Sequence, residues 1–227
     1  MKGYQDHWDC SLCEAQVSLL EPTCGTCGNR RIGKLLLLVR HGQAEHNVRR
    51  KGDAVRVRDP SLTALGREQA SQLRAKLPTA DFLVAVVSPL SRTLQTAQAL
   101  GLGAAPPPPR VLVTHLHSER NPQSSPSDTG TEPQALQEQF PEFAFGHLPR
   151  EWWGTRETDG DWKTRRVEEF KSFLLHDVAA DNVLVIGHAC FTRQLLHGSD
   201  HAPVLGNCQA RFALLHPNLS VEPLHLL

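Results

Sequence analysis

The stretch KLLLLVRHGQAEHN, residues 34–47, decides the fold. Its apolar run, Leu35 to Val39, leads without interruption into Arg40, His41 and Gly42. This pattern predicts a short strand that is buried on both faces. In open α/β sheets, ligands bind at the carboxyl ends of such strands. An isolated Arg-His pair after a strand is more often only a basic turn, so the interpretation depends on what the other strands deliver.

Three more short apolar runs predict further buried strands, and the segments between them predict helices. The expected strands are 82–87, 110–115 and 183–186, and the expected helices begin near residues 61, 91, 162 and 191. Residues 210–215 and Val221 are expected at the edge of the sheet. Alternating strands and helices predict an α/β protein, a three-layer α/β/α sandwich with a mostly parallel central sheet.

Charged or imidazole side chains follow several of the expected strands. Arg92 opens the helix after the second strand, Glu119 lies just beyond the third, and His188 ends the fourth. Parallel strands bring these ends, together with Arg40 and His41, to one edge of the sheet. Two guanidinium groups and two imidazoles favour an anion, most simply phosphate. A carboxylate at the rim of such a pocket is what a general acid requires.

Composition limits the classes of function. The chain has 227 residues, a formal net charge of +0 and 40% hydrophobic residues, which fits one α/β domain with a small appendage. Bulk charge therefore suggests neither nucleic acid nor an anionic membrane surface as a partner. The start, MKGYQDHWDC, lacks the apolar run of a secretory signal. We expect a cytoplasmic or nuclear protein without a membrane partner.

Four of the six cysteines form the pattern C-x2-C-x10-C-x2-C, namely Cys10, Cys13, Cys24 and Cys27. Two close pairs on a short loop can place four thiolates around one structural zinc ion, which would supply the folding energy of so small a unit. The alternative is two redox pairs or free thiols, although neither pair lies in a βαβ context. No cofactor is expected for catalysis.

The residues around these cysteines resemble the Ran-binding-protein-type zinc finger. Trp8-Asp9-Cys10 has its W-x-C opening, and Gly28 follows the last cysteine as in that family. The resemblance implies a protein or RNA partner. However, Val17 stands where the family has an asparagine, and no basic, aromatic-rich face suited to single-stranded RNA accompanies it.

Four segments of the chain contain a second set of short sequence motifs. They are Arg40-His41-Gly42 with Asn47, Asp59-Pro60-x-Leu62-Thr63-x-x-Gly66, Ser88-Pro89-Leu90-x-Arg92-Thr93-x-x-Thr96-Ala97, and Gly187-His188. With these motifs, residues 34–220 resemble the histidine phosphatase superfamily, which has the fold of cofactor-dependent phosphoglycerate mutases.

That resemblance implies a metal-independent, two-step phosphoryl transfer. His41 would attack phosphorus and become a phosphohistidine. The phosphoryl oxygens would be held by Arg40, Asn47, Arg92 and His188. Glu119 would protonate the leaving oxygen and then activate water, and Glu132 is the alternative proton donor.

A phosphatase acting on a small phosphorylated substrate is favoured over a mutase. Mutases of the family usually have Glu-Arg followed by an aromatic-Gly pair, whereas Glu119-Arg120 continues into Asn121-Pro122 here. A phosphoglycerate mutase-type phosphotransferase and a phosphate-binding adaptor without turnover remain alternatives. The sequence does not name the substrate.

Two expectations concern organisation. The polar residues 120–133 are either a disordered insertion or a lid over the pocket. Residues 1–31 are assigned to the zinc-finger-like unit and residues 34–227 to the phosphatase-like domain. We expect the two to fold separately, with the zinc unit serving to recruit a partner.

Overall fold

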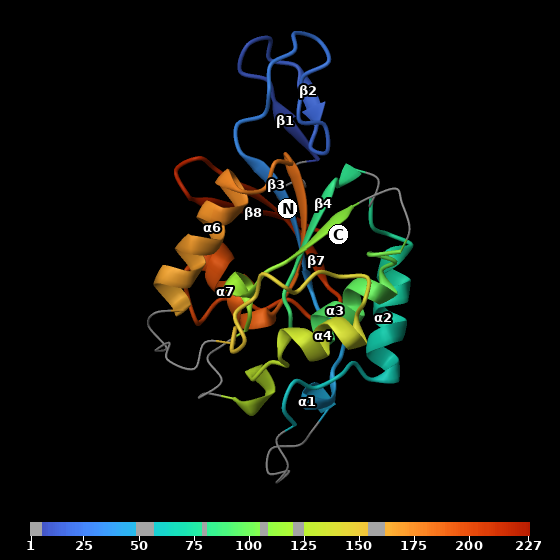
Figure 1. Cartoon of the computed structure of the whole chain (residues 1–227). Coiled ribbons are helices and arrows are strands. Elements are labelled where there is room, and N and C mark those ends of the chain that lie inside the picture. The colour runs from blue at the N-terminus through green and yellow to red at the C-terminus, as the bar shows by residue number, and fades with distance from the viewer. Residues whose placement is uncertain (1–5, 49–56, 79–80, 105–108, 120–124, 154–161) are drawn as a thin grey trace.

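The computed structural model describes residues 6–48, 57–78, 81–104, 109–119, 125–153 and 162–227. A mixed six-stranded sheet forms its centre, in the order β5-β4-β6-β3-β7-β8 (Figure 1). The strands are β3 (Lys34–Arg40), β4 (Val84–Val87), β5 (Arg110–Val113), β6 (Asn182–Gly187), β7 (Ala210–Leu215) and β8 (Val221–Leu226). The first four of these run parallel, and β7 and β8 continue the sheet antiparallel from β3. The predicted α/β fold is confirmed.

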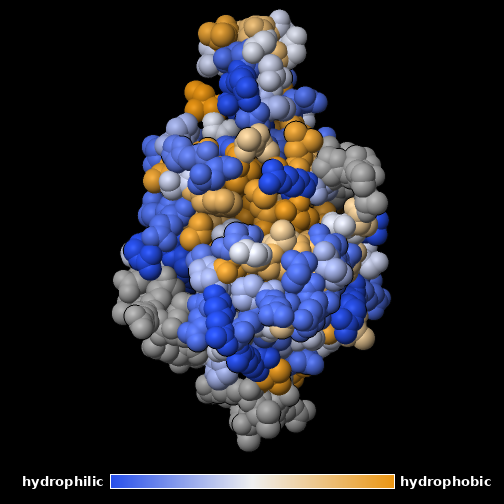
Figure 2. Space-filling model, viewed as in Figure 1, coloured by the Kyte–Doolittle hydropathy of each residue, from blue (hydrophilic) through white to orange (hydrophobic). Residues whose placement is uncertain are grey.

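Helices cover both faces of the sheet. On one face lie α2 (Ala64–Arg74), α3 (Ser91–Ala99) and α4 (Pro133–Gln139), and on the other lie α6 (Val167–His176) and α7 (Ala189–His197). In the same view, Figure 2 shows polar side chains over much of the helical surface and an apolar area between the two helical layers. No helix among the described residues is long and apolar enough to cross a membrane.

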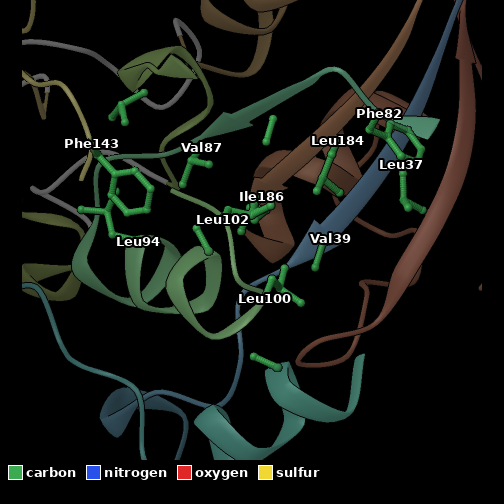
Figure 3. Close-up of a cluster of buried hydrophobic side chains, with 14 of the residues drawn as sticks. Leu37, Val39, Phe82, Val87, Leu94, Leu100, Leu102, Phe143, Leu184 and Ile186 are labelled. Carbon is green, nitrogen blue, oxygen red and sulfur yellow. The ribbon is translucent and has the colours of Figure 1, made fainter. Parts of the chain in front are cut away.

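The apolar run of β3 explains the three layers. Leu35, Leu37 and Val39 pack into the core beneath α2 and α3, whereas Leu36 and Leu38 pack into the core beneath α6 and α7. Figure 3 shows the first core, in which strand side chains meet side chains of the α3 region. All five residues are at most 1% exposed. Since each buried leucine or valine contributes about 1.5–3 kcal/mol, this strand anchors both cores.

The structure departs from the sequence interpretation in three places. β7 is an interior strand between β3 and β8, so only β8 lies at that edge. The helix expected from residue 162 opens with a π-helical turn, Trp162–Arg166, before α6 begins. The short helix α1 (Glu45–Val48) and α4 were not expected. Thr63 caps α2, because its side chain accepts a hydrogen bond from the Gly66 amide.

The N-terminal residues form a separate small sheet. Strands β1 (His7–Asp9) and β2 (Gln16–Ser18) pair antiparallel, with Trp8 opposite Val17. The unit stands out from one end of the molecule, near the start of β3 and far from α1 (Figure 1).

Buried contacts join this unit to the sheet. Arg31 is 8% exposed and donates to the carbonyl of Leu19 at 2.5 Å and to Asn182 Oδ1 at 2.7 Å. Asn182 in turn donates to the carbonyl of Leu20 at 2.7 Å, and Leu19 packs into the core beneath α2 and α3. The N-terminal unit therefore shares a buried interface with the amino ends of the strands, and its separate folding stays a prediction.

Candidate active site

The carboxyl ends of neighbouring strands bring the two motif histidines together. β3 and β6 end in register, with Arg40 opposite Gly187, and the His41 amide donates to the Gly187 carbonyl at 3.0 Å. The His41 and His188 rings lie 5.4 Å apart between centroids. Ser88, at the end of the adjacent β4, places its hydroxyl 2.8 Å from His188 Nε2. The predicted meeting of strand ends is thus confirmed.

His41 is buried at the end of β3, and one of its ring nitrogens contacts the backbone. It is 1% exposed, and its Nδ1 lies 2.7 Å from the Gly42 carbonyl oxygen. A carbonyl can only accept, so the ring proton resides on Nδ1 and Nε2 carries the lone pair. Burial holds the pKa of His41 well below its usual value, and the charges of Arg92 and Arg40 lower it further.

Arg92 lies at the start of α3 and is 1% exposed. Its Nη1 donates to the Ser127 carbonyl at 2.8 Å, and its Nη2 donates to Asp128 Oδ1 at 2.9 Å. Ser127 and Asp128 belong to a 3₁₀ turn, Pro126–Asp128, and both are buried. Of the polar segment 120–133, residues 125–133 are therefore ordered against the site, while 120–124 lie outside the described residues.

A second carboxylate fixes the helix that carries Arg92. Asp59 accepts from the Ser91 amide and the Ser91 hydroxyl, both at 2.8 Å, and from the Thr131 hydroxyl at 2.8 Å. Asp59 is 9% exposed, so these bonds are shielded from water. It thereby ties the first turn of α3 to the segment that contacts Arg92. The Asp59-Pro60 motif was recognised in the sequence, but this role was not.

The turn before β7 holds Arg40 and His41. Arg40 Nη1 donates to the Leu205 carbonyl at 2.8 Å, and the Cys208 amide donates to the Arg40 carbonyl at 3.1 Å. Asn207 Nδ2 donates to the His41 carbonyl at 3.1 Å and to Asn47 Oδ1 at 3.2 Å. No motif in the sequence pointed to this turn, which meets Arg40 only because β7 pairs with β3.

His46 is a site residue that the sequence interpretation missed. Its ring lies 5.7 Å from that of His41, and Asn47 Nδ2 is 3.0 Å from its Nε2. Because an amide nitrogen donates, His46 Nε2 accepts and its proton is on Nδ1. Burial lowers the pKa of His46 to about 3, helped by the charges of Arg92 and Arg40. The residue lies inside the first motif, next to Asn47, and that proximity was the available signal.

Two motif glycines allow the loop after His41 to lie directly on α2. A Cβ on Gly42 would come 2.4 Å from the Gly66 carbonyl oxygen, and a Cβ on Gly66 would come 2.0 Å from the Gln43 oxygen. Any side chain at either position would force the backbones apart. The Gly42 amide also donates to Thr96 Oγ1 at 3.1 Å, which links this loop to α3.

Several buried nitrogen atoms around His41 have no hydrogen-bond partner among the residues that the structure describes. These atoms are Arg40 Nε, Arg92 Nε, His46 Nδ1 and His188 Nδ1. A buried donor without a partner costs about 1–3 kcal/mol, so each such donor calls for a partner such as water, an ion or a ligand. Two cations and several unpaired donors suit an anion with several oxygens.

Glu119 lies near these side chains, whereas Glu132 faces solvent. Glu119 Oε1 accepts from the amides of Cys190 at 2.9 Å and Phe191 at 3.3 Å, in the first turn of α7, directly after His188. Burial lowers the pKa of Arg40, and the nearby charge of Glu119 opposes that shift. Glu132, by contrast, pairs with Arg150 at 3.1 Å, and its side chain is 46% exposed.

Residues 36–220 match the family described as the histidine phosphatase superfamily (branch 1), and the chain belongs to that superfamily. The match includes all four motifs and begins after the cysteine-rich unit. Among curated protein sequences, none matches the chain.

Solved structures of similar fold include several phosphatases. A mycobacterial glucosyl-3-phosphoglycerate phosphatase is 19% identical, with a TM-score of 0.55 over 84% of this chain and 96% of that one. A phosphoserine phosphatase from Entamoeba histolytica is 18% identical, with a TM-score of 0.54 over 85% and 96%. The protein TTHB049 from Thermus thermophilus is 24% identical, with a TM-score of 0.53 over 86% and 99%. At these identities the likeness shows the shared fold.

The four cysteines of the N-terminal unit form one cluster. The sulfur atoms of Cys10, Cys13, Cys24 and Cys27 all lie within 4.8 Å of one another. Tetrahedral zinc with Zn–S distances of about 2.3 Å separates its sulfur ligands by about 3.8 Å, so the donor set fits this ion. The two halves also match in backbone conformation, because Glu14 (φ 57°) and Gly28 (φ 75°) follow the second cysteine of each pair.

Proposed function

We propose that the protein is a phosphomonoester phosphatase that works through a phosphohistidine on His41. The observation that carries the proposal is the buried, neutral His41 ring, with its Nε2 lone pair free of the Gly42 contact, beside Arg40 and Arg92. Membership of the superfamily supports the same chemistry.

In the first step, His41 Nε2 attacks phosphorus, a P–N bond forms and the P–O ester bond breaks. Arg40, Arg92, Asn47 and His188 hold the phosphoryl oxygens, and the guanidinium charges act where other phosphoryl-transfer enzymes use metal ions. The unpaired Arg40 Nε and Arg92 Nε supply donors for this purpose. In the second step, water attacks phosphorus and the P–N bond breaks, which releases phosphate and restores His41.

Glu119 donates the proton that the leaving oxygen needs and takes one from water in the second step. Both amide hydrogen bonds from α7 go to Oε1, which acts as the acceptor. The transferable proton is therefore carried by Oε2, so the first turn of α7 selects which oxygen serves as the acid.

The test is hydrolysis of 4-nitrophenyl phosphate by purified protein, followed by a panel of phosphomonoesters. Glu119→Gln is expected to slow alkyl phosphates by roughly 10²–10⁴-fold, because a general acid contributes about that factor. The same change should affect nitrophenyl phosphate much less, since its leaving group needs little protonation. A phosphate-binding adaptor would bind inorganic phosphate without turnover, and a mutase would move phosphate between acceptors instead of releasing it. The named substrates of the structural relatives differ from one another, so none is carried over.

We also propose that the four cysteines hold one structural zinc ion and that the unit recruits a protein or RNA partner. The clustered sulfur atoms support the ion, and the position of the hairpin at one end of the molecule, far from α1, supports recruitment. Elemental analysis of purified protein should find one zinc per chain. A chain without zinc but with disulfide-linked pairs would favour the redox alternative.

A further inference from the structure

Arg166 is a buried cation that the proposed mechanism does not use. It closes the π-helical turn Trp162–Arg166, just before α6, and it is 6% exposed. Its guanidinium lies 5.8 Å from the Trp162 ring and 5.6 Å from the Phe191 ring. π-helical turns are uncommon and occur often at functional sites.

The guanidinium of Arg166 donates hydrogen bonds to the backbone at Ser118 and Glu119. Its Nη1 donates to the Ser118 carbonyl at 2.7 Å, and its Nη2 donates to the Glu119 carbonyl at 2.9 Å. A planar fork that reaches two successive carbonyls fixes their orientation as well as their position. Ser118 is buried, so water does not compete for its carbonyl to the same extent as at a surface.

Glu119 is consequently held at both ends. Its backbone carbonyl is bound by Arg166, and its carboxylate is bound by the Cys190 and Phe191 amides of α7. Phe191 also packs against the Arg166 guanidinium, so Arg166 contacts both the first turn of α7 and the backbone at Glu119. Since α7 begins directly after His188, this arrangement sets the carboxyl group relative to the two active-site histidines.

We propose that Arg166 is a positioning residue for proton transfer by Glu119. This inference rests on the proposed function, in which Glu119 is the general acid. Proton transfer depends steeply on the placement of the acid, and a displacement of about 1 Å can cost 10²-fold. Without the fork, the Ser118–Glu119 backbone loses two hydrogen bonds, while the bonds from α7 to the Glu119 carboxylate remain.

The test is the ratio of two rates measured on one preparation. Arg166→Lys and Arg166→Gln remove the fork while keeping a polar side chain. The expected result is a loss of about 10-fold or more in kcat/KM for an alkyl phosphate, with nitrophenyl phosphate changed by less than about 3-fold. Because inactive protein lowers both rates equally, a partly folded variant does not alter the ratio. Arg165→Lys is the matched control, since Arg165 pairs with Glu169 and its side chain is 57% exposed.

A double variant shows whether Arg166 acts through Glu119. In a Glu119→Gln background, Arg166→Lys is expected to cause no further loss on the alkyl phosphate. Equal slowing of both substrates by the Arg166 variants, or a further 10-fold loss in the double variant, would overturn the inference while leaving Glu119 in place. If Glu119→Gln itself slows both substrates equally, the assignment of Glu119 fails first, and the role of Arg166 fails with it.

Discussion

Replacing Arg31 with methionine should destabilise the whole protein without impairing its chemistry. The change keeps the apolar stem but removes donors to the Leu19 carbonyl, the Asp181 carbonyl and Asn182 Oδ1. Each buried acceptor left unsatisfied costs about 1–3 kcal/mol. Because the surrounding residues relax in part, we expect the free energy of unfolding to fall by about 3 kcal/mol in total. For a chain of this size, each kcal/mol shifts Tm by roughly 2–4 °C, so Tm should fall by about 6–12 °C.

Arg30→Met is the matched control for this change. Arg30 pairs with Asp181, but its side chain is 68% exposed, and surface pairs contribute about 0–1 kcal/mol. Thermal melts of both variants should be recorded together with kcat/KM for nitrophenyl phosphate at 25 °C. The folded Arg31 variant should keep its kcat/KM, because Arg31 contacts the amino ends of the strands and the active site lies at their carboxyl ends. Equal melting of the two variants, or a loss of kcat/KM by Arg31→Met, would refute the reasoning.

Three further predictions concern the cysteine cluster, His117 and Glu132. A strong chelator, or Cys10→Ser, should remove one zinc ion and lower Tm, while hydrolysis of 4-nitrophenyl phosphate at 25 °C continues. Activity that is lost with the zinc and returns when zinc is added back would contradict this prediction. Burial lowers the pKa of His117 in the folded protein to about 3, whereas the unfolded chain takes up a proton at this residue near pH 6.5. The free energy of unfolding should therefore fall as the pH drops below 6.5, and His117 should account for a loss of about 2 kcal/mol at pH 5. Chemical denaturation should show a shallower slope between pH 6.5 and 5 for His117→Gln, and an unchanged slope would count against that assignment. Glu132→Gln should leave the rates on alkyl and nitrophenyl phosphates within about 2-fold, because Glu132 pairs with Arg150 at the surface; a selective loss on alkyl phosphates would transfer the acid role to it.

The strand ends were predictable because their signals are local. An apolar run followed by Arg40-His41 indicates both the strand and the group at its end, and His188 follows a run of the same kind. Once the sheet is parallel, its topology alone brings these residues together. The general location of Glu119 followed by the same reasoning.

The residues that support the site were not predictable in this way. Asp128 reaches Arg92 across 36 positions, and Arg166 reaches Glu119 across 47. No periodic pattern encodes such pairs, because they depend on how loops from different strands meet above the sheet. For the same reason, nothing in the sequence indicated the buried interface at which Arg31 and Leu20 of the N-terminal unit bond to Asn182 of β6.

The central claim is the covalent intermediate on His41. Purified protein should be mixed with a ³²P-labelled phosphomonoester that it hydrolyses, and quenched within a turnover in alkali, where phosphohistidine survives. The labelled peptide should contain His41, and the label should be lost on acid treatment. His41→Ala should take up no label, whereas His197→Ala, a change at an exposed position at the end of α7, should be labelled as the natural chain is. Label retained in His41→Ala, or turnover without any labelled protein, would contradict the account.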